Sequence, residues 1–292
     1  MLNLKVAELL VSIQAKDLDS AHLSNMANFV TEEIEGIDRL FEVSFSDCLE
    51  IAGTLLQGRV LLDEGICEIY GHEDCYYIKT IDDPAMKPPG ILKISANYDR
   101  AIIRTRPYNW LASQYKDKPY LTNKDLLNLV FRLAILFHQG LVLHASAVTH
   151  HGECYAFLGN SGTGKSTHTD LWVKYFGAMK LNDDSPAVRM INGKAIVYGT
   201  PWSGSVDCYE NDSAPLAGLC MLRQARENKI VRLEPLEAFT ALLSMCTLTV
   251  WDQRLINLTI DNLNQLVQTV PVYRLECRPD LEAAELARSS MK

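Results

Sequence analysis

The spacing of apolar residues predicts a mixture of helices and strands in the second half of the chain. Between residues 123 and 137, apolar side chains recur every three or four positions, which is the period of an amphipathic helix, and Gly140 follows as a stop signal. From Leu141 onward, short apolar runs typical of buried strands alternate with helical segments. The expected strands are Glu153–Leu158, Ala178–Lys180, Ala187–Ile191, Lys194–Tyr198, Leu219–Arg223, Lys229–Leu233 and Val272–Leu275, and the expected helices are Asn123–Phe137, Ser166–Phe176, Pro235–Leu243 and Asp252–Val267.

Turn residues between these runs predict how neighbouring strands connect. Asn192-Gly193 gives the strongest hairpin signal, because this pair tolerates the positive φ angles of a type I′ turn. The runs at 219–223 and 229–233 are expected to form a second strand pair. The C-terminal part is therefore expected to be mixed α and β, with antiparallel hairpins added to a strand–loop–helix unit around residues 153–176.

The N-terminal part has a different pattern. Its mixed polar and apolar sequence up to about Ile37 is typical of helices. Two hairpins and a break follow, which predict a small antiparallel sheet. The hairpins are Ile66–Tyr70 with Tyr76–Lys79 around Gly71–Asp74, and Ile91–Ile94 with Ala101–Arg104 around Asn97–Asp99, and the break is Pro88-Pro89-Gly90. We therefore expect a small α+β accessory domain at 1–140 and a catalytic domain at 141–292.

Composition narrows the class of protein. The 292 residues are 48% hydrophobic and 22% charged, which is ordinary for a globular protein with a sizeable core. The net charge of −8 disfavours nucleic acid as a partner, and no run is long and apolar enough to span a membrane. The start of the chain lacks the pattern of a secretory signal, and the eight scattered cysteines form no C-x-x-C pair. These observations favour reduced thiols and a cytoplasmic protein.

One segment carries a specific chemical signal, a phosphate loop. Residues 159–166 fit the pattern G-x-x-x-x-G-K-[ST] without a mismatch, between an expected strand and an expected helix. The backbone N–H groups of such a loop surround phosphate oxygens, Lys165 reaches the terminal phosphates and the Ser166 hydroxyl binds Mg²⁺. The residues expected to bind ATP are Gly159, Asn160, Ser161, Gly162, Thr163, Gly164, Lys165, Ser166 and Thr167.

An acidic pair follows the loop by one helix and one strand. The end of that strand is expected beside the phosphate loop, so Asp183 and Asp184 are candidates for two tasks. One carboxylate would hold Mg²⁺, and the other would accept the proton of an attacking hydroxyl. The alternative is a solvated Asp-Asp turn, which the preceding phosphate loop disfavours.

Several weaker signals leave alternatives open. His144, in the run Leu143–Val148, is either a hydrogen-bonded core residue or a ligand. Trp202-Ser203-Gly204 is either a substrate loop or an ordinary turn. Arg223, Arg226 and Lys229 either neutralise transferred phosphate or form a solvated surface, and the surface is favoured. His150, His151 and His168 have no partner at metal-ligand spacing and are expected to face solvent.

Three blocks together resemble a known family: Leu143–Ala147, Gly159–Thr167 and Asn182–Asp184. They resemble the HPr kinase/phosphorylase catalytic domain and the nucleotide site of ATP-dependent phosphoenolpyruvate carboxykinase, which shares that fold. Gly199–Gly204, Pro215-Leu216 and Leu275–Asp280 look like a bacterial HPr-kinase-like branch, some members of which accompany peptide-modification systems. The resemblance covers residues 140–292. HPr kinases usually have an acidic residue where this chain has Thr167.

The resemblance implies a mixed α/β phosphate-loop domain and an ATP- and Mg²⁺-dependent phosphotransferase. Lys165 would hold the β- and γ-phosphates, Ser166 and one of Asp183 and Asp184 would bind the metal, and the other aspartate would activate the acceptor hydroxyl. His144 would lie beside them, orienting or ligating. The acceptor would be a protein, a peptide or a small molecule, and a homo-oligomer remains open because related kinases assemble. Two alternatives are a nucleotide-binding regulator with little turnover and a carboxykinase-like enzyme acting on a small organic acid.

Overall fold

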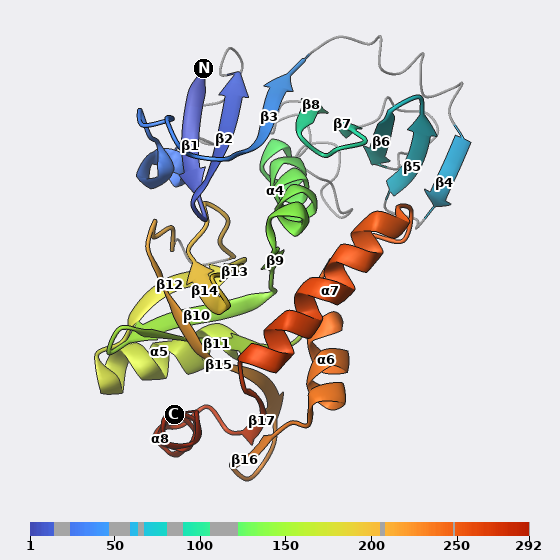
Figure 1. Ribbon diagram of the computed structural model, residues 1–292. Coiled ribbons are helices and arrows are strands. Elements are labelled where there is room, and N and C mark those ends of the chain that lie inside the picture. The colour runs from blue at the N-terminus through green and yellow to red at the C-terminus, as the bar shows by residue number, and fades with distance from the viewer. Residues whose placement is uncertain are drawn as a thin grey trace, which may run out of the picture. The chain divides into compact units, whose positions relative to one another are not determined.

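The chain forms two compact units, each built on a mixed β-sheet (Figure 1). The computed structural model describes residues 1–14, 24–46, 59–63, 67–80, 90–105, 122–204, 208–247 and 249–291. Unit 1 comprises Met1–Ala134 with Val250–Gln253, and unit 2 comprises Ile135–Thr249 with Arg254–Lys292. Among the described helices, none combines the length and the apolar character that a membrane crossing needs.

Unit 1 contains an eight-stranded sheet in the order β1-β2-β3-β8-β7-β6-β5-β4. Strand β3 is parallel to both β2 and β8, and the other pairs are antiparallel. The strands of the two expected hairpins pair antiparallel as predicted, and only β3 makes the sheet mixed. The described elements are β1 Leu2–Val6, β2 Leu9–Gln14, the 3-10 helix η2 Ser24–Phe29, β3 Arg39–Phe45, β4 Arg59–Asp63, β5 Cys67–His72, β6 Cys75–Thr80, β7 Gly90–Ser95, β8 Arg100–Thr105 and α4 Asn123–Ala134.

The helical expectation for the first 37 residues is wrong for residues 2–14, whereas Ser24–Phe29 form the short 3-10 helix η2. Leu2 to Gln14 form a hairpin, because Ala7 and Glu8 both adopt positive φ, 54° and 62°, and turn the chain back on itself. The apolar residues of this segment satisfy both a period of two and a period near 3.6, and only pairing with β3 selects the strand. Residues 15–23, Ile66 and Pro88-Pro89 lie outside the described residues.

A short segment far along the chain completes unit 1. The Tyr76 and Tyr98 hydroxyls both donate hydrogen bonds to Asp252 Oδ2, at 3.1 and 3.0 Å. Tyr98 is fully buried, and its burial together with the Asp252 charge raises the pKa of its phenol. These bonds account for the membership of Val250–Gln253 in unit 1.

Unit 2 contains a nine-stranded sheet whose main path is β12-β10-β11-β15-β14-β13-β9. Strand β15 pairs in parallel with β11 on one side and with β17 on the other. Helix α5 packs on β10, β11 and β12. The described elements are the 3-10 helix η3 Ile135–His138, β9 Gly140–Val142, β10 Ala145–His150, β11 Glu153–Leu158, α5 Lys165–Phe176, β12 Met179–Asp184, β13 Ala187–Ile191, β14 Lys194–Tyr198, β15 Ser213–Gln224, β16 Lys229–Arg232, α6 Pro235–Leu243, α7 Gln253–Thr269, β17 Val272–Cys277 and α8 Leu281–Ser290.

The backbone geometry of unit 2 confirms the turn and the helix end that the sequence predicts. Asn192 and Gly193 have φ angles of 50° and 76°, as a type I′ turn between β13 and β14 requires. Gly177 ends α5 at a φ of 67°, and its N–H donates to Val173 O. Trp172 of α5 is fully buried beside Phe157 of β11, which fixes the helix on the sheet.

Three further expectations are corrected. The strands at 213–224 and 229–232 are not neighbours, because β17 lies between them and pairs with both. The helix beginning at Asn123 ends at Ala134 and tightens into η3. His168 is buried rather than solvent-facing, since Trp172 Nε1 donates to its Nε2 at 3.3 Å.

Candidate functional site

The phosphate loop leaves the end of β11 through backbone conformations that favour glycine. Gly159, Gly162 and Gly164 have φ angles of 151°, 79° and 101°. A Cβ on Gly159 would lie 2.7 Å from Thr163 Oγ1 and 3.2 Å from Leu222 O. The Thr163 hydroxyl and amide both donate to Asn160 O, at 2.8 and 3.2 Å, and close the loop on itself. A residue with a side chain at 159 would therefore open the loop.

Lys165 is held at the centre of the site. Its Nζ lies 2.9 Å from Gly159 O, 3.4 Å from Asn160 O and 2.9 Å from His144 Nε2. Burial lowers the pKa of Lys165, while the charges of Asp184 and Asp183 act in the opposite direction. An anion bound in the loop would favour the charged ammonium in the same way.

His144 joins the lysine to the acidic pair. Its Nδ1 lies 3.0 Å from Asp184 Oδ1, and its backbone N–H donates to Met245 O at 3.2 Å. Because an ammonium group only donates, His144 Nε2 accepts from Lys165, and the imidazole proton sits on Nδ1 facing Asp184. Lys165, His144 and Asp184 thus form a continuous chain of contacts beside the start of β10 and the ends of β11 and β12.

Strand register brings these residues together. Strand β10 lies between β11 and β12, and Ala145 is opposite Leu158 on one side and Asp184 on the other. The phosphate loop, which follows Leu158, and the acidic pair therefore flank the start of β10, where His144 lies. Residues separated by about 40 positions in the sequence are neighbours for this reason.

The two aspartates face different environments. Asp183 is buried, and its Oδ2 is 3.9 Å from Lys180 Nζ, which also contacts Asp170 of α5 at 2.7 Å. Asp183 is paired in register with Ser146, whose hydroxyl is 2.8 Å from the Thr169 hydroxyl of α5. Because adjacent strand residues point to opposite faces, Asp183 lies on the α5 face of the sheet and Asp184 on the other.

Asp184 is held in a strained backbone conformation. Its φ of 148° belongs to a region that residues with side chains rarely adopt. Ser203 forms an isolated bridge with Asp184, and Gly204 N–H donates to Asp183 O at 2.7 Å. The Ser185 hydroxyl also donates to Asp184 Oδ2 at 3.0 Å. The Trp202–Gly204 segment thus packs directly on the acidic pair and keeps the last residue of β12 in place.

A buried hydrogen-bond network fixes the position of the Trp202–Gly204 segment. Asn182 Nδ2 donates to Trp202 O and Thr200 O at 3.0 and 3.1 Å, and its Oδ1 accepts from Ser185 N–H at 2.8 Å. The Thr200 hydroxyl donates to Ser185 O at 2.8 Å. All three polar side chains are fully buried, so the conformation of the acidic pair is fixed by satisfied buried polar groups.

The remaining predicted site residues lie along the loop and at the start of α5. Asn160, Ser161 and Thr167 are exposed, and Ser166 is half-buried. The backbone carbonyl of Ser166 accepts a hydrogen bond from Thr169 Oγ1 at 2.9 Å. Across the part of the chain that the structure describes, no three His, Cys, Asp or Glu side chains converge on a metal site. Magnesium bound through one carboxylate, a hydroxyl and substrate phosphates needs no such cluster.

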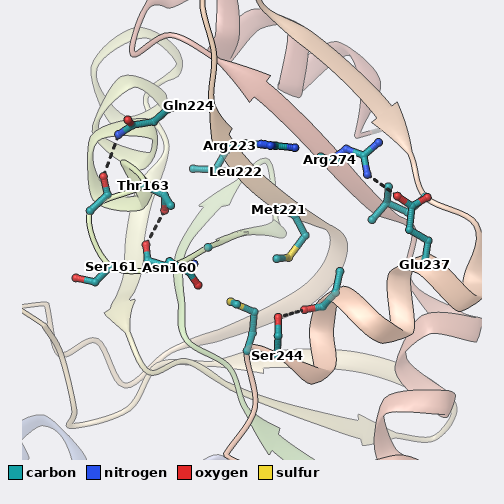
Figure 2. A pocket seen from close by; sticks show the side chains of 15 residues that line it. Asn160, Ser161, Thr163, Met221, Leu222, Arg223, Gln224, Glu237, Ser244 and Arg274 are labelled. Carbon is teal, nitrogen blue, oxygen red and sulfur yellow. Dashed lines mark hydrogen bonds and ion pairs between the residues drawn. The ribbon is translucent and has the colours of Figure 1, made fainter.

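Two pockets flank the loop. The larger, of about 630 Å³, is bounded by Gly159–Thr163, Met221–Gln224, Arg274 and residues from Leu233 to Met245 (Figure 2). The smaller, of about 320 Å³, is bounded by Thr163, Gly164, His168, Leu222, Gln224, Ala225 and Cys277–Pro279. Gln224 lines both and donates to Gly162 O at 3.0 Å. No sequence motif identifies Gln224 or Met245, because only the fold brings them to the loop.

Arg226 and Lys229 are exposed, as the favoured interpretation expects, and they line neither pocket. Arg223, which sequence analysis grouped with them, lines the larger pocket. The described cysteines are free thiols, with Cys154 and Cys220 fully buried, and Cys48 lies outside the described residues.

Comparison with known proteins gives no assignment for this arrangement. No protein-family model matches the chain, and a search among curated proteins finds no significant match.

Proposed function

We propose that the chain is an ATP-dependent kinase that transfers the γ-phosphoryl group to a hydroxyl of a protein, peptide or small-molecule acceptor. The observation that carries the proposal is the contact chain Lys165–His144–Asp184 at the mouth of a glycine-containing phosphate loop. A cation for the phosphates, an oriented carboxylate for the acceptor proton and a loop of inward backbone N–H groups are the parts that phosphoryl transfer requires.

The fold assignment that accompanies this proposal is a phosphate-loop domain of the HPr kinase/phosphoenolpyruvate carboxykinase type in unit 2. It is supported by the strand before the loop, the helix after it and the adjacency of β12 to β10. Such a kinase would work in the cytoplasm, where ATP is available and free thiols stay reduced.

The two aspartates take separate roles in this proposal. Asp183 faces α5, the helix that begins with Lys165 and Ser166, so Asp183 and the Ser166 hydroxyl would hold Mg²⁺. This donor set consists of hard oxygen atoms, which suit Mg²⁺, and the metal would neutralise charge on the β- and γ-phosphates. Asp184, oriented by His144, would accept the proton of the acceptor hydroxyl.

The nucleoside would occupy the smaller pocket. Ligands of parallel sheets bind outside the carboxyl ends of the strands, and this pocket is lined by the residues that follow β11, β15 and β17. With the phosphates in the loop and the base there, the γ-phosphate would point toward Gly159 and His144. Catalysis would then come mainly from positioning and charge stabilisation.

Three variants test the proposal through ATP consumption with candidate acceptors. Lys165→Ala should lower turnover by about 10²- to 10³-fold, because the charge next to the transferred phosphate is lost. Asp183→Asn should raise the Mg²⁺ concentration needed for half-maximal rate, whereas Asp184→Asn should lower kcat at every Mg²⁺ concentration. Lys174→Ala, on the exposed side of α5, is the matched control. Full activity of both Lys165→Ala and Asp183→Asn would refute the site, and tight nucleotide binding without transfer to any acceptor would favour the regulator.

A further inference from the structure

The larger pocket lies against the half of the phosphate loop nearest the reacting group. Its loop wall is Gly159–Thr163, and the carbonyls of Gly159 and Asn160 hold Lys165 Nζ. At its other end the pocket reaches Met245, whose carbonyl accepts the His144 N–H. The pocket therefore touches the backbone that holds both Lys165 and His144.

The pocket and Asp184 share one face of the sheet. Leu222 of β15 packs with Trp172 of α5 in the core, so Met221 and Arg223 on either side of it point away from α5. Arg274 of β17 is opposite Met221 in the parallel register and extends to the same face. Asp184 also lies on the face away from α5. A molecule in the pocket would thus approach the γ-phosphate from the side of the carboxylate that would activate it.

The lining has an apolar floor and a cationic far wall. Met221, Leu233, Ala241 and Met245 provide apolar surface. Figure 2 shows Arg223 and Arg274 on the wall across from Asn160, with Arg274 contacting Glu237 of α6. The lining itself contains two arginines and one glutamate, and Arg223 Nη1 also lies 3.8 Å from Glu276 of β17, so each arginine has one carboxylate neighbour. A guanidinium carries five N–H donors and binds a carboxylate through two of them, so Arg274 has the donor capacity for a second anionic partner.

We propose that this pocket binds the phosphoryl acceptor and selects one that carries a carboxylate, an apolar body and a hydroxyl. The carboxylate binds Arg274 and Arg223, the apolar body covers Met221 and Met245, and the hydroxyl reaches the loop end beside Asp184. A volume of about 630 Å³ is that of a small-molecule site. The inference rests on the proposed function for the identity of the reaction, and the acid preference itself is a property of the pocket.

Binding of defined probes tests the acid preference. The full chain is titrated by calorimetry with para-hydroxyphenylpropionate and ω-hydroxyhexanoate, each beside its uncharged primary amide, with and without Mg²⁺ and a non-hydrolysable ATP analogue. The acids should bind about 10- to 100-fold more tightly than the amides, as expected for hydrogen bonds to a charged group. Arg274→Met should reduce the difference, and the double variant Arg223→Met with Arg274→Met should remove it. Glu237→Gln should strengthen acid binding, because the guanidinium loses a competing carboxylate.

Arg232→Met is the matched control, since Arg232 is an exposed arginine of the adjacent strand β16 and does not line the pocket. Equal binding of acids and amides, an acid preference that survives the double variant, or no probe binding at about 1 mM would overturn the inference. Competition between the acids and the ATP analogue would also overturn it, because the pocket would then hold the nucleoside. If the acid preference is present but the analogue does not bind, the proposed function fails and the acid site stands.

Discussion

Both units place positive φ angles at non-glycine residues in turns, and unit 2 has one more at the end of a strand. In unit 1 they occur where one strand turns into the next, at Ala7, Glu8, Glu73 and Tyr98. In unit 2 Gln139, His151 and Asn192 likewise lie between elements, whereas Asp184, with a φ of 148°, is the last residue of β12 and contacts His144. Turns need such conformations to reverse the chain, whereas the end of a strand does not. Strain at Asp184 therefore indicates that the candidate site requires this backbone conformation.

The two units also differ in where their buried polar side chains lie. Among the described residues, unit 1 buries Ser12, Arg104 and Asp252 at separate places in its core. Six of the ten buried polar residues described in unit 2 gather around the ends of β10 and β12, and most of them hydrogen-bond one another: Ser146, Thr169, Asn182, Asp183, Ser185 and Thr200. Polar groups in a core are costly unless they are satisfied, so their concentration in one place marks the region where orientation matters most.

The largest expected effect concerns His168, the buried histidine of unit 2. Burial lowers its pKa to about 4 from 6.5, so between these values the unfolded chain binds more protons than the folded one. Stability should therefore fall by about 3 kcal/mol as the pH drops from 6.5 to 4 and be unaffected by this group above that window. Denaturant titrations followed by tryptophan fluorescence measure the change. His168→Gln, which can still accept from Trp172, should flatten the profile by this amount, and parallel profiles would contradict the assignment.

The second prediction separates strain from function at Asp184. Asp184→Gly and Asp184→Asn both remove the carboxylate, but only glycine adopts a φ of 148° without strain. The glycine variant should be more stable than the asparagine variant by about 1 kcal/mol, after the greater chain entropy of glycine is allowed for. Both should lose phosphoryl transfer. Equal unfolding free energies for the two variants would mean that the backbone at 184 stores no strain.

The smallest effect tests the turns of unit 1. Glu73 is exposed and has a φ of 51° between β5 and β6. Asparagine tolerates this conformation better than glutamate, so Glu73→Asn should raise the free energy of unfolding by about 0.5 kcal/mol and leave ATP turnover unchanged. Asp74→Asn removes the same charge at the next position, which has no positive φ, and should give no such gain. A loss of ATP turnover in Glu73→Asn would remove the contrast between the two units.

Local sequence patterns predicted the elements of unit 2 well because each depends on a few adjacent residues. Glu153–Leu158 forms β11 with the expected bounds, and Asn192-Gly193 makes its turn through its own φ preferences. Pairing between strands was less predictable. The position of β17 between β15 and β16 depends on contacts across more than 40 residues, and no local pattern encodes them. The first hairpin was missed because its apolar spacing fits helix and strand equally.

The burial of His168 shows a similar limit at the level of one side chain. Its sequence neighbours are polar, and nothing in the motif distinguishes it from an exposed residue of α5. It is buried because the next turn of the helix places Trp172 against β11, and the indole N–H then provides a partner within the core. Propensity and motif spacing describe what a residue can do, and packing decides which side of the helix it occupies.

The sequence by itself determined the conformation of the glycine-rich loop at 159–166, since its glycines and Lys165 are specified by adjacent positions and by backbone sterics. It also supplied Asp183, Asp184 and His144 as candidates. Only the tertiary structure decided that Asp184 is the carboxylate joined to His144 and Lys165, that Asp183 faces α5, and that Arg274 stands across a pocket from the loop. The reason is that strand order and register set these distances, and both arise from pairing between segments far apart in the chain.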